Sequence, residues 1–153
     1  MSSALESLQS AIVRQLREPM THLGATVIAR RAADLESQLE TAIQAALGLS
    51  IIVLDPLPRR VEPAAPGPVF AEILITVRVI ENLLINEHGT GILAAAEHAS
   101  AALHLWPLSA PWAGQVLRLA ENNPWTNPAG PLRGAVALDL HFLAASATTP
   151  AHS

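Results

Sequence analysis

The middle of the chain holds a long segment in which apolar and mixed positions alternate. From Val69 to Asn82 the odd positions up to 79 are all apolar, whereas the even positions include Glu72, Thr76 and Arg78. Successive side chains of a strand point to opposite faces of its sheet, so a period of two residues is typical of a strand with one buried face. The pattern predicts one long β-strand over this segment.

Two segments near the N-terminus repeat apolar residues at spacings of three and four. The first covers residues 3–18, where Ser3 and Glu6 form a capping box, and Pro19 is expected to end it. The second covers residues 35–46. Side chains three and four residues apart share one face of a helix, so both segments are predicted to be amphipathic helices.

A third helix is predicted after the long strand. Small and polar residues mark the helix ends: Asp34 is expected to cap the second helix, Gly48 to end it, and Thr90 to cap the third. The apolar stripe of the third helix comprises Ile92, Ala96, Ala99, Leu103 and Trp106.

Three shorter runs predict further strands. Leu49–Asp55 is rich in branched residues and lies between a glycine and a proline. Gln115–Glu121 and the alternating segment Leu132–Leu143 are separated by Asn122–Pro131, which is dense in turn residues. These last two strands are therefore expected to form a hairpin.

Proline dominates the segment Pro56–Pro68, which contains five of these residues. Because proline lacks a backbone N–H, we expect this segment to lie outside the sheet as a projecting loop or arm. Arg59, Arg60 and Glu62 lie within the arm and are candidates for contacts with another protein. Restricted backbone freedom lowers the entropy that a segment loses on docking, which favours such a role.

The predicted elements together indicate one α+β domain over residues 1–143. Its two layers would be an antiparallel or mixed sheet of about four strands and helices packed mainly on one face. The segment 20–33 fits neither helix nor strand clearly, and residues 144–153 are expected to form a flexible C-terminal tail. A chain of 153 residues is long enough to bury the core of one domain.

The composition excludes several classes of function. The net charge is −4 and the arginines are scattered, so the sequence predicts no specific binding of nucleic acid. No apolar stretch is long enough to span a membrane, no signal peptide is recognisable, and the absence of cysteine rules out disulfides and thiolate sites. Half of the residues are hydrophobic and only 14% are charged, which leaves apolar surface for contacts between subunits.

Residues that can bind metal occur along the chain, but their spacing matches no known site. They comprise His88, Glu97, His98, His104 and His141. There is no His-Glu-x-x-His pair, no Gly-x-Ser-x-Gly nucleophile turn and no phosphate loop. We therefore expect no catalytic residue, no metal and no cofactor.

The polar residues after the long strand and the three tryptophans allow structural interpretations. Asn82 and Asn86 are expected to hold the turn by side-chain hydrogen bonds to the backbone. Trp106 falls on the apolar stripe and is expected in the core. For Trp112 and Trp125, which lie in proline-rich loops, two alternatives stay open: a protein interface, or a ring that folds back over the edge of the sheet.

These features resemble the tail-terminator and tail-completion proteins of long-tailed phages and phage-derived particles. The resemblance rests on the long strand running into Glu81 and Asn82, on Asn86 before the helix, and on Trp106 and Pro107 at the end of the helix. It implies a structural α+β subunit that assembles in the bacterial cytoplasm into a ring of the virion tail or neck. Such a ring, hexameric in this family, caps the tail tube, stops its elongation and provides the surface for head attachment.

The resemblance also implies the partners of the protein. They are further copies of itself, the tail tube protein, connector or neck proteins and, in a contractile tail, the sheath protein. The arm and the loop that contains Asn127 are the candidate interfaces. Two alternatives stay open: a head–tail joining or neck protein, and, from another class, a small metal-dependent or ligand-binding enzyme.

Overall fold

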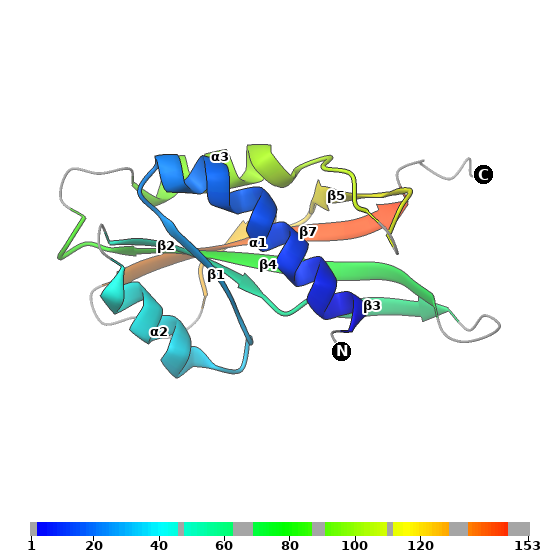
Figure 1. Cartoon of the computed structure of the whole chain (residues 1–153), viewed down its shortest axis with the longest axis horizontal. Coiled ribbons are helices and arrows are strands. Elements are labelled where there is room, and N and C mark those ends of the chain that lie inside the picture. The colour runs from blue at the N-terminus through cyan, green and yellow to red at the C-terminus, as the bar shows by residue number, and fades with distance from the viewer. Residues whose placement is uncertain are drawn as a thin grey trace.

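A seven-stranded mixed sheet forms the centre of the molecule in the computed structural model (Figure 1). Its strands follow the order β1-β2-β4-β7-β5, while β3 pairs with β4 and β6 pairs with β7. The structure describes residues 3–45, 48–62, 69–86, 91–109, 112–128 and 135–146. The predicted α+β class with a mixed sheet is confirmed, but the estimate of about four strands was too low.

The helices are α1 (Ala4–His22), α2 (Leu35–Gln44) and α3 (Ile92–Leu103). The strands are β1 (Thr26–Arg30), β2 (Leu49–Leu54), β3 (Leu57–Glu62), β4 (Val69–Asn82), β5 (Gln115–Leu119), β6 (Trp125–Thr126) and β7 (Ala135–Ser146).

The long strand β4 is the axis of the sheet and matches the predicted segment. Its odd positions Ile73, Ile75, Val77 and Val79 are fully buried. One border of β4 pairs with β3 near its start and with β2 near its end, and the other border pairs with β7 along almost its whole length. The alternation in sequence therefore predicted the buried face correctly.

Helices cover both faces of the sheet. α1 and α3 pack against each other and, with the odd positions of β4, form the main core. α2 lies on the opposite face, where Gln38 contacts Arg78 and a smaller cluster surrounds Ile52 and Ile80. The expectation that the helices pack mainly on one face is met by two of the three.

Two predicted helix starts are confirmed and one helix end was placed too early. The side chain of Ser3 accepts a hydrogen bond from Glu6 N, and that of Asp34 accepts one from Ser37 N. α1 continues through Pro19 to His22. A proline inside a helix removes one backbone hydrogen bond and crowds the preceding turn, and the full burial of Met20 beyond it in the core offsets this cost.

The start of α3 differs from the prediction. Its N-cap is Gly91, which makes no side-chain capping bond, while Thr90 lies outside the described residues. Four of its residues are buried on the sheet, namely Ala95, Ala96, Ala99 and Leu103.

The segment 20–33, which the sequence left unassigned, contains the strand β1. β1 pairs in parallel with β2, and α2 forms the connection between them. The strand is short and its burial is uneven, with Thr26 exposed and Val27 buried, so no clean alternation marks it. Only the pairing with β2 reveals it as a strand.

The expectation of an arm at 56–68 was wrong for its first part. Leu57–Glu62 forms β3, which pairs antiparallel with the start of β4. β3 has a partner on one side only and its register shifts after Pro58 and again after Arg60. An edge position and an irregular ladder are the conditions under which a strand tolerates proline. Residues 63–68 lie outside the described part of the chain.

The C-terminal hairpin is confirmed, and its second strand continues past Leu143 to Ser146. β5 pairs antiparallel with β7 from Gln115 opposite Ser146 to Leu119 opposite Phe142, and the two-residue strand β6 pairs further along β7. Ala144 is fully buried, so residues 144–146 belong to the sheet and not to the expected tail. Residues 147–153 lie outside the described part.

Candidate interaction surfaces

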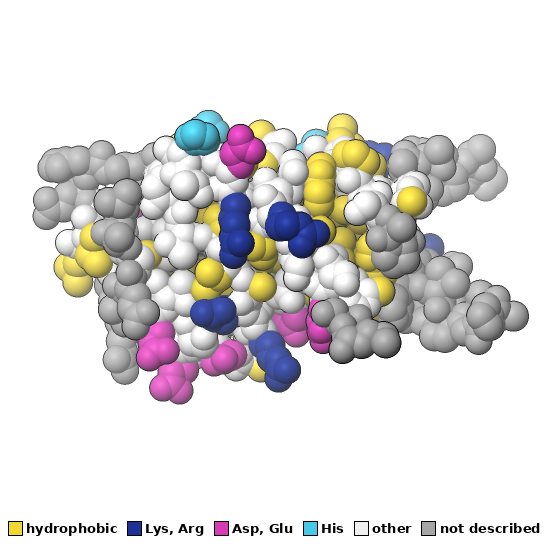
Figure 2. All heavy atoms as spheres, viewed as in Figure 1, with side chains coloured by type: hydrophobic (Ala, Val, Ile, Leu, Met, Phe, Trp, Pro, Cys, Tyr) yellow, Lys and Arg dark blue, Asp and Glu magenta, His cyan; other side chains and the backbone are white. Residues whose placement is uncertain are grey.

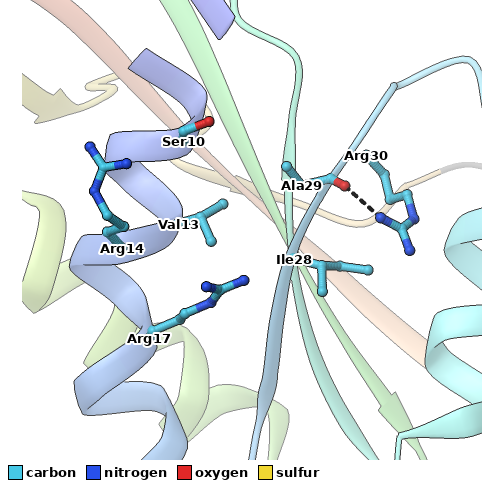
Figure 3. Close-up of a pocket in the computed structure, with 7 residues that line it drawn as sticks. All are labelled: Ser10, Val13, Arg14, Arg17, Ile28, Ala29 and Arg30. Carbon is cyan, nitrogen blue, oxygen red and sulfur yellow. Dashed lines mark hydrogen bonds between the residues drawn. The ribbon is translucent and has the colours of Figure 1, made fainter. Parts of the chain in front are cut away.

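A groove with arginine side chains runs between α1 and β1 (Figure 3). It has a volume of about 400 Å³. Its lining comprises Ser10, Val13, Arg14, Arg17, Ile28, Ala29 and Arg30. Ser10, Arg14 and Arg17 follow one another at helical spacing, so they lie along one side of α1, next to the buried positions that hold the helix on the sheet.

The arginines of the groove differ in direction. In Figure 3 the guanidinium of Arg17 extends from α1 towards β1, whereas that of Arg14 points away from β1. Arg30 lies on the other side of β1, and its Nη1 donates a hydrogen bond to Ala29 O at 2.9 Å. Figure 2 shows arginine side chains gathered on the middle of this face of the molecule. Sequence reasoning treated these arginines as scattered, because only the fold brings residue 30 beside residues 14 and 17.

The turn after β4 is held by a set of polar contacts that the sequence predicted in part. Asn82 Oδ1 accepts a hydrogen bond from Leu84 N at 3.1 Å, as expected for a side chain that holds a turn. The Asn86 side chain bonds differently, since its Nδ2 donates to Glu81 Oε2 at 2.6 Å. Glu81 is 8% exposed, so its carboxylate is a buried anchor for the turn.

This turn presents three consecutive large apolar side chains to the solvent. Leu83, Leu84 and Ile85, which we call the apolar tip, are 52%, 79% and 44% exposed. Ile85 N and Asn86 N both donate to Asn82 O, so the backbone of the tip is closed by hydrogen bonds. Figure 2 shows exposed apolar atoms at this end of the molecule, at the left. The polar residues around the tip could be predicted from the sequence, but the exposure of the tip could not.

A second apolar surface crosses β4 at Leu74, in the half of the strand away from the tip. Leu57 of β3, Leu74 of β4 and Leu143 of β7 stand opposite one another in the register of the sheet, and we call them the leucine row. Cross-strand partners point to the same face. Leu74 occupies an even position of β4, so the row lies on the face of α2, but α2 packs near Arg78 and leaves Leu57 58% exposed.

The arginines predicted as contacts of the arm lie on β3. Arg59 is 53% exposed at its side chain and forms an ion pair of 3.6 Å with Glu72 on β4. It also lines a hollow with Arg118 and Leu143, next to the leucine row. Arg60 is exposed and stands opposite Glu72. The position of Glu62 is at the end of β3.

The tryptophans fold back onto the domain. Trp112 is 7% exposed and belongs to the main core, and Trp125 packs against that core with its indole N–H donating to Ser100 Oγ at 3.3 Å. Trp106 is partly buried against the core as expected. The structure therefore favours the second alternative for Trp112 and Trp125.

The remaining predicted residues lie near the end of α3 and the start of β5. Pro107 forms a bridge with Val116, so the segment after α3 covers the outer border of β5. Asn127 is exposed after β6. Both Pro107 and Asn127 are exposed, so both are available for contact with another molecule.

A polar network crosses the face of the sheet beneath α2. Arg78 forms two hydrogen bonds with the carboxylate of Asp139, at 2.8 and 3.0 Å, and a third with Gln38 Oε1 at 2.7 Å. Beside it, the ring of His141 contacts the hydroxyl of Thr126 at 2.8 Å. These contacts pair the polar groups with one another.

The candidate metal ligands are not brought together. In the described part of the chain no three histidine or acidic side chains gather in a way that would hold an ion. His104 Nδ1 accepts a hydrogen bond from Leu119 N at 3.0 Å, and His141 lies in the network described above. His88 lies outside the described residues. No helix in the described ranges is both long and apolar enough to cross a membrane.

Comparison with known proteins adds no family to these observations. No family model matches the chain, and neither a curated protein nor a solved structure matches it.

Proposed function

We propose that this chain is a structural subunit that assembles head to tail into a ring, in the manner of the phage tail terminators that its sequence resembles. The observation that carries the proposal is the pair of separate apolar surfaces: the apolar tip after β4 and the leucine row that crosses the first half of β4. A ring of identical copies is built from contacts between two different surfaces of each copy. One chain that exposes two unlike apolar surfaces meets this requirement.

The two surfaces cannot meet within one molecule. Leu74 and Leu83 are nine residues apart along an extended segment, which corresponds to roughly 30 Å at about 3.3 Å per residue. Burying a leucine side chain fully stabilises a contact by roughly 1.5–3 kcal/mol. We infer that the apolar tip of one copy packs on the leucine row of the next.

The hydrogen bonds around the tip support this role. A tip whose backbone is held by Asn82 and by the buried Glu81–Asn86 contact loses little conformational entropy when it docks. Exposed leucines on a rigid turn also favour a partner over a purely structural purpose, since a turn needs no apolar side chains.

Disulfide cross-linking tests the contact directly, because the chain has no cysteine of its own. The variant Leu84→Cys/Leu57→Cys places one thiol on the tip and one at the start of the row. A disulfide requires Cα atoms within about 7 Å, which excludes a bond inside one molecule. We expect oxidation to produce a ladder of covalent oligomers on a non-reducing gel, which collapses to the monomer on reduction.

The control replaces Leu35, which is exposed to the same extent as Leu57, at 57% against 58%. Leu84→Cys/Leu35→Cys should give only random dimers at a low rate. An equal ladder from both double variants would show that the disulfides form by random collision. A protein that sediments as a monomer at all concentrations would refute the proposed ring.

Addition of the protein to growing tail tubes tests the function itself. A terminator caps the tubes and limits their length, which electron microscopy of negatively stained tubes measures. Rings that bind an isolated head connector but leave tube length unchanged would instead support the head–tail joining alternative. Rings that bind neither tail tubes nor the head connector would support ring formation but refute the assignment of the ring to a phage tail.

A further inference from the structure

The groove between α1 and β1 lies where the sheet would accept one more strand. β1 pairs with β2 on one side, and no strand of the described residues pairs with its other side. Edge strands expose unpaired N–H and C=O groups, and many proteins protect them with prolines, bulges or covering segments. Thr26–Arg30 contains no proline and its register with β2 is regular. In the described chain, two side-chain bonds reach the backbone of β1: Arg30 Nη1 donates to Ala29 O and Gln9 Nε2 donates to Arg30 O.

The charge of the groove is entirely positive. Its lining contains Arg14, Arg17 and Arg30 and no acidic residue. Among the residues that the structure describes, no carboxylate lies within ion-pair distance of any of the three. Charged surfaces of one sign favour a partner of the opposite sign.

The two faces of β1 determine the surroundings of alternate side chains in an added strand. Val27 and Ala29 face the core beneath α1, whereas Ile28 faces the smaller cluster on the side of α2. Side chains of neighbouring strands that stand opposite each other share a face. In an added strand, every second side chain would therefore lie beside Arg17 of α1, and the others would lie beside Ile28.

We propose that this groove binds an extended acidic segment of a partner protein, which joins the sheet as a further strand next to β1. A carboxylate of the segment pairs with Arg17, which extends towards β1, and apolar side chains at the neighbouring positions pack beside Ile28. A backbone N–H of the segment replaces the Arg30 guanidinium at Ala29 O. Arg30 is then released to bind a further carboxylate.

An extended peptide suits the site better than a nucleic acid. Main-chain hydrogen bonds to β1 require a polypeptide backbone in the extended conformation. Nucleic acids bind mainly through phosphates and wide basic surfaces, whereas this chain carries a net charge of −4. The site does not depend on the proposed ring, since all of its lining residues come from one copy of the chain.

Fluorescence anisotropy with labelled eight-residue peptides and the full-length chain provides the test. The probe alternates glutamate and valine. Its first control has the same composition with the glutamates in one block, and its second replaces glutamate by lysine. We expect saturable binding of the alternating acidic peptide, at least about tenfold weaker binding of both controls, and weaker binding as the salt concentration rises.

A matched pair of variants localises the site. Arg17→Glu removes the arginine that extends into the groove and should weaken binding of the acidic peptide about tenfold or more. Arg59→Glu makes the same charge change on β3, far from the groove, and should leave binding within about twofold. In NMR spectra, the amide signals that shift most on titration should belong to residues 26–30.

Several results would overturn the proposal. Equal binding of the alternating and block peptides would show that the groove attracts acidic peptides by charge alone, without strand addition. Equal losses from Arg17→Glu and Arg59→Glu would place the peptide elsewhere. No binding at millimolar peptide, or tighter binding of a twelve-nucleotide oligothymidine than of the peptide, would also refute it.

Discussion

Gly48 connects the start of β2 to the turn after β4 through close backbone contacts. Its φ angle is +79°, and a Cβ added there would lie 2.9 Å from Asn86 N and 3.0 Å from Asn82 O. Its carbonyl accepts a hydrogen bond of 2.7 Å from Asn82 N. A side chain at this position therefore has to separate the backbone segments that hold the apolar tip.

The variant Gly48→Ala is expected to lower the free energy of unfolding by about 2–4 kcal/mol, since backbone strain of about 1–3 kcal/mol adds to the steric clash. The control is Gly114→Ala, where φ is +89° but an added Cβ has nothing within 4 Å. It should cost only the strain, about 1 kcal/mol. Urea unfolding followed by circular dichroism measures both, and equal losses would show that the crowding at Gly48 is relieved without cost.

The Arg78–Asp139 pair is the second feature at the residue scale. Both side chains are nearly buried, at 13% and 10% exposure, and the bonds to Asp139 and Gln38 use both terminal nitrogens and Nε of the arginine. A buried ion pair adds little net stability when compared with apolar residues of the same shape, but one charge left alone is costly.

Asp139→Leu should therefore destabilise the domain by about 3–5 kcal/mol, because it leaves the guanidinium of Arg78 buried without its carboxylate. Combining it with Arg78→Met removes that charge and should restore most of the loss. A double-mutant cycle in urea measures the coupling. Simple addition of the two single effects would contradict the interpretation.

At the scale of elements, β4 shows how one strand serves two environments. Its odd positions face the main core, and its even positions face the polar network and the leucine row. Val77 is fully buried, whereas its neighbour Thr76 is partly exposed and contacts the ring of His141 at 3.4 Å. Substitutions one residue apart should consequently have very different effects.

Val77→Asp is expected to unfold the domain, because burying an unpaired carboxylate costs several kcal/mol and the total stability of a domain is about 5–15 kcal/mol. Thr76→Asp places the same charge on the other face, beside His141, and the protein should stay folded. Far-ultraviolet circular dichroism and thermal melting distinguish the two variants. A folded Val77→Asp protein with an unchanged melting curve would mean that the faces of β4 are assigned incorrectly.

At the scale of the whole molecule, unlike surfaces lie on different parts of the fold. The tip follows β4, the leucine row crosses the first half of that strand, and the basic groove borders β1. Leu84 in the tip is 79% exposed, so it contributes little to the core of the isolated chain. Its role is therefore tested by measuring the assembly of the protein and not its free energy of unfolding.

Leu84→Ser should shift the protein to the monomer in sedimentation velocity while the unfolding free energy of the monomer changes by no more than about 0.5 kcal/mol. Leu93→Ser is the control, since Leu93 is 62% exposed on α3 outside both surfaces. It should leave the assembly intact. Loss of assembly in both variants would point to a general effect of surface hydrophobicity, and assembly retained in both would exclude the tip from the contact.

Much of the fold was predictable because its signals are local. The alternation in Val69–Asn82, the caps Ser3 and Asp34, and the turn formed by Asn82 each depend on residues close in the chain. A buried face or a capped backbone N–H can be recognised from residues that lie only a few positions apart in the sequence. From the sequence alone it was therefore possible to assign the α+β class, the long central strand and the turn held by the Asn82 side chain.

The rest depended on contacts between distant segments. β1 and β3 are strands because β2 and β4 lie beside them, and their own sequences, one without clear alternation and one rich in proline, do not require it. Arg30 meets Arg17 only through the packing of α1 on the sheet. The backbone groups at a strand edge are the same in every sequence, so pairing, edges and grooves are decided by which segments meet in space.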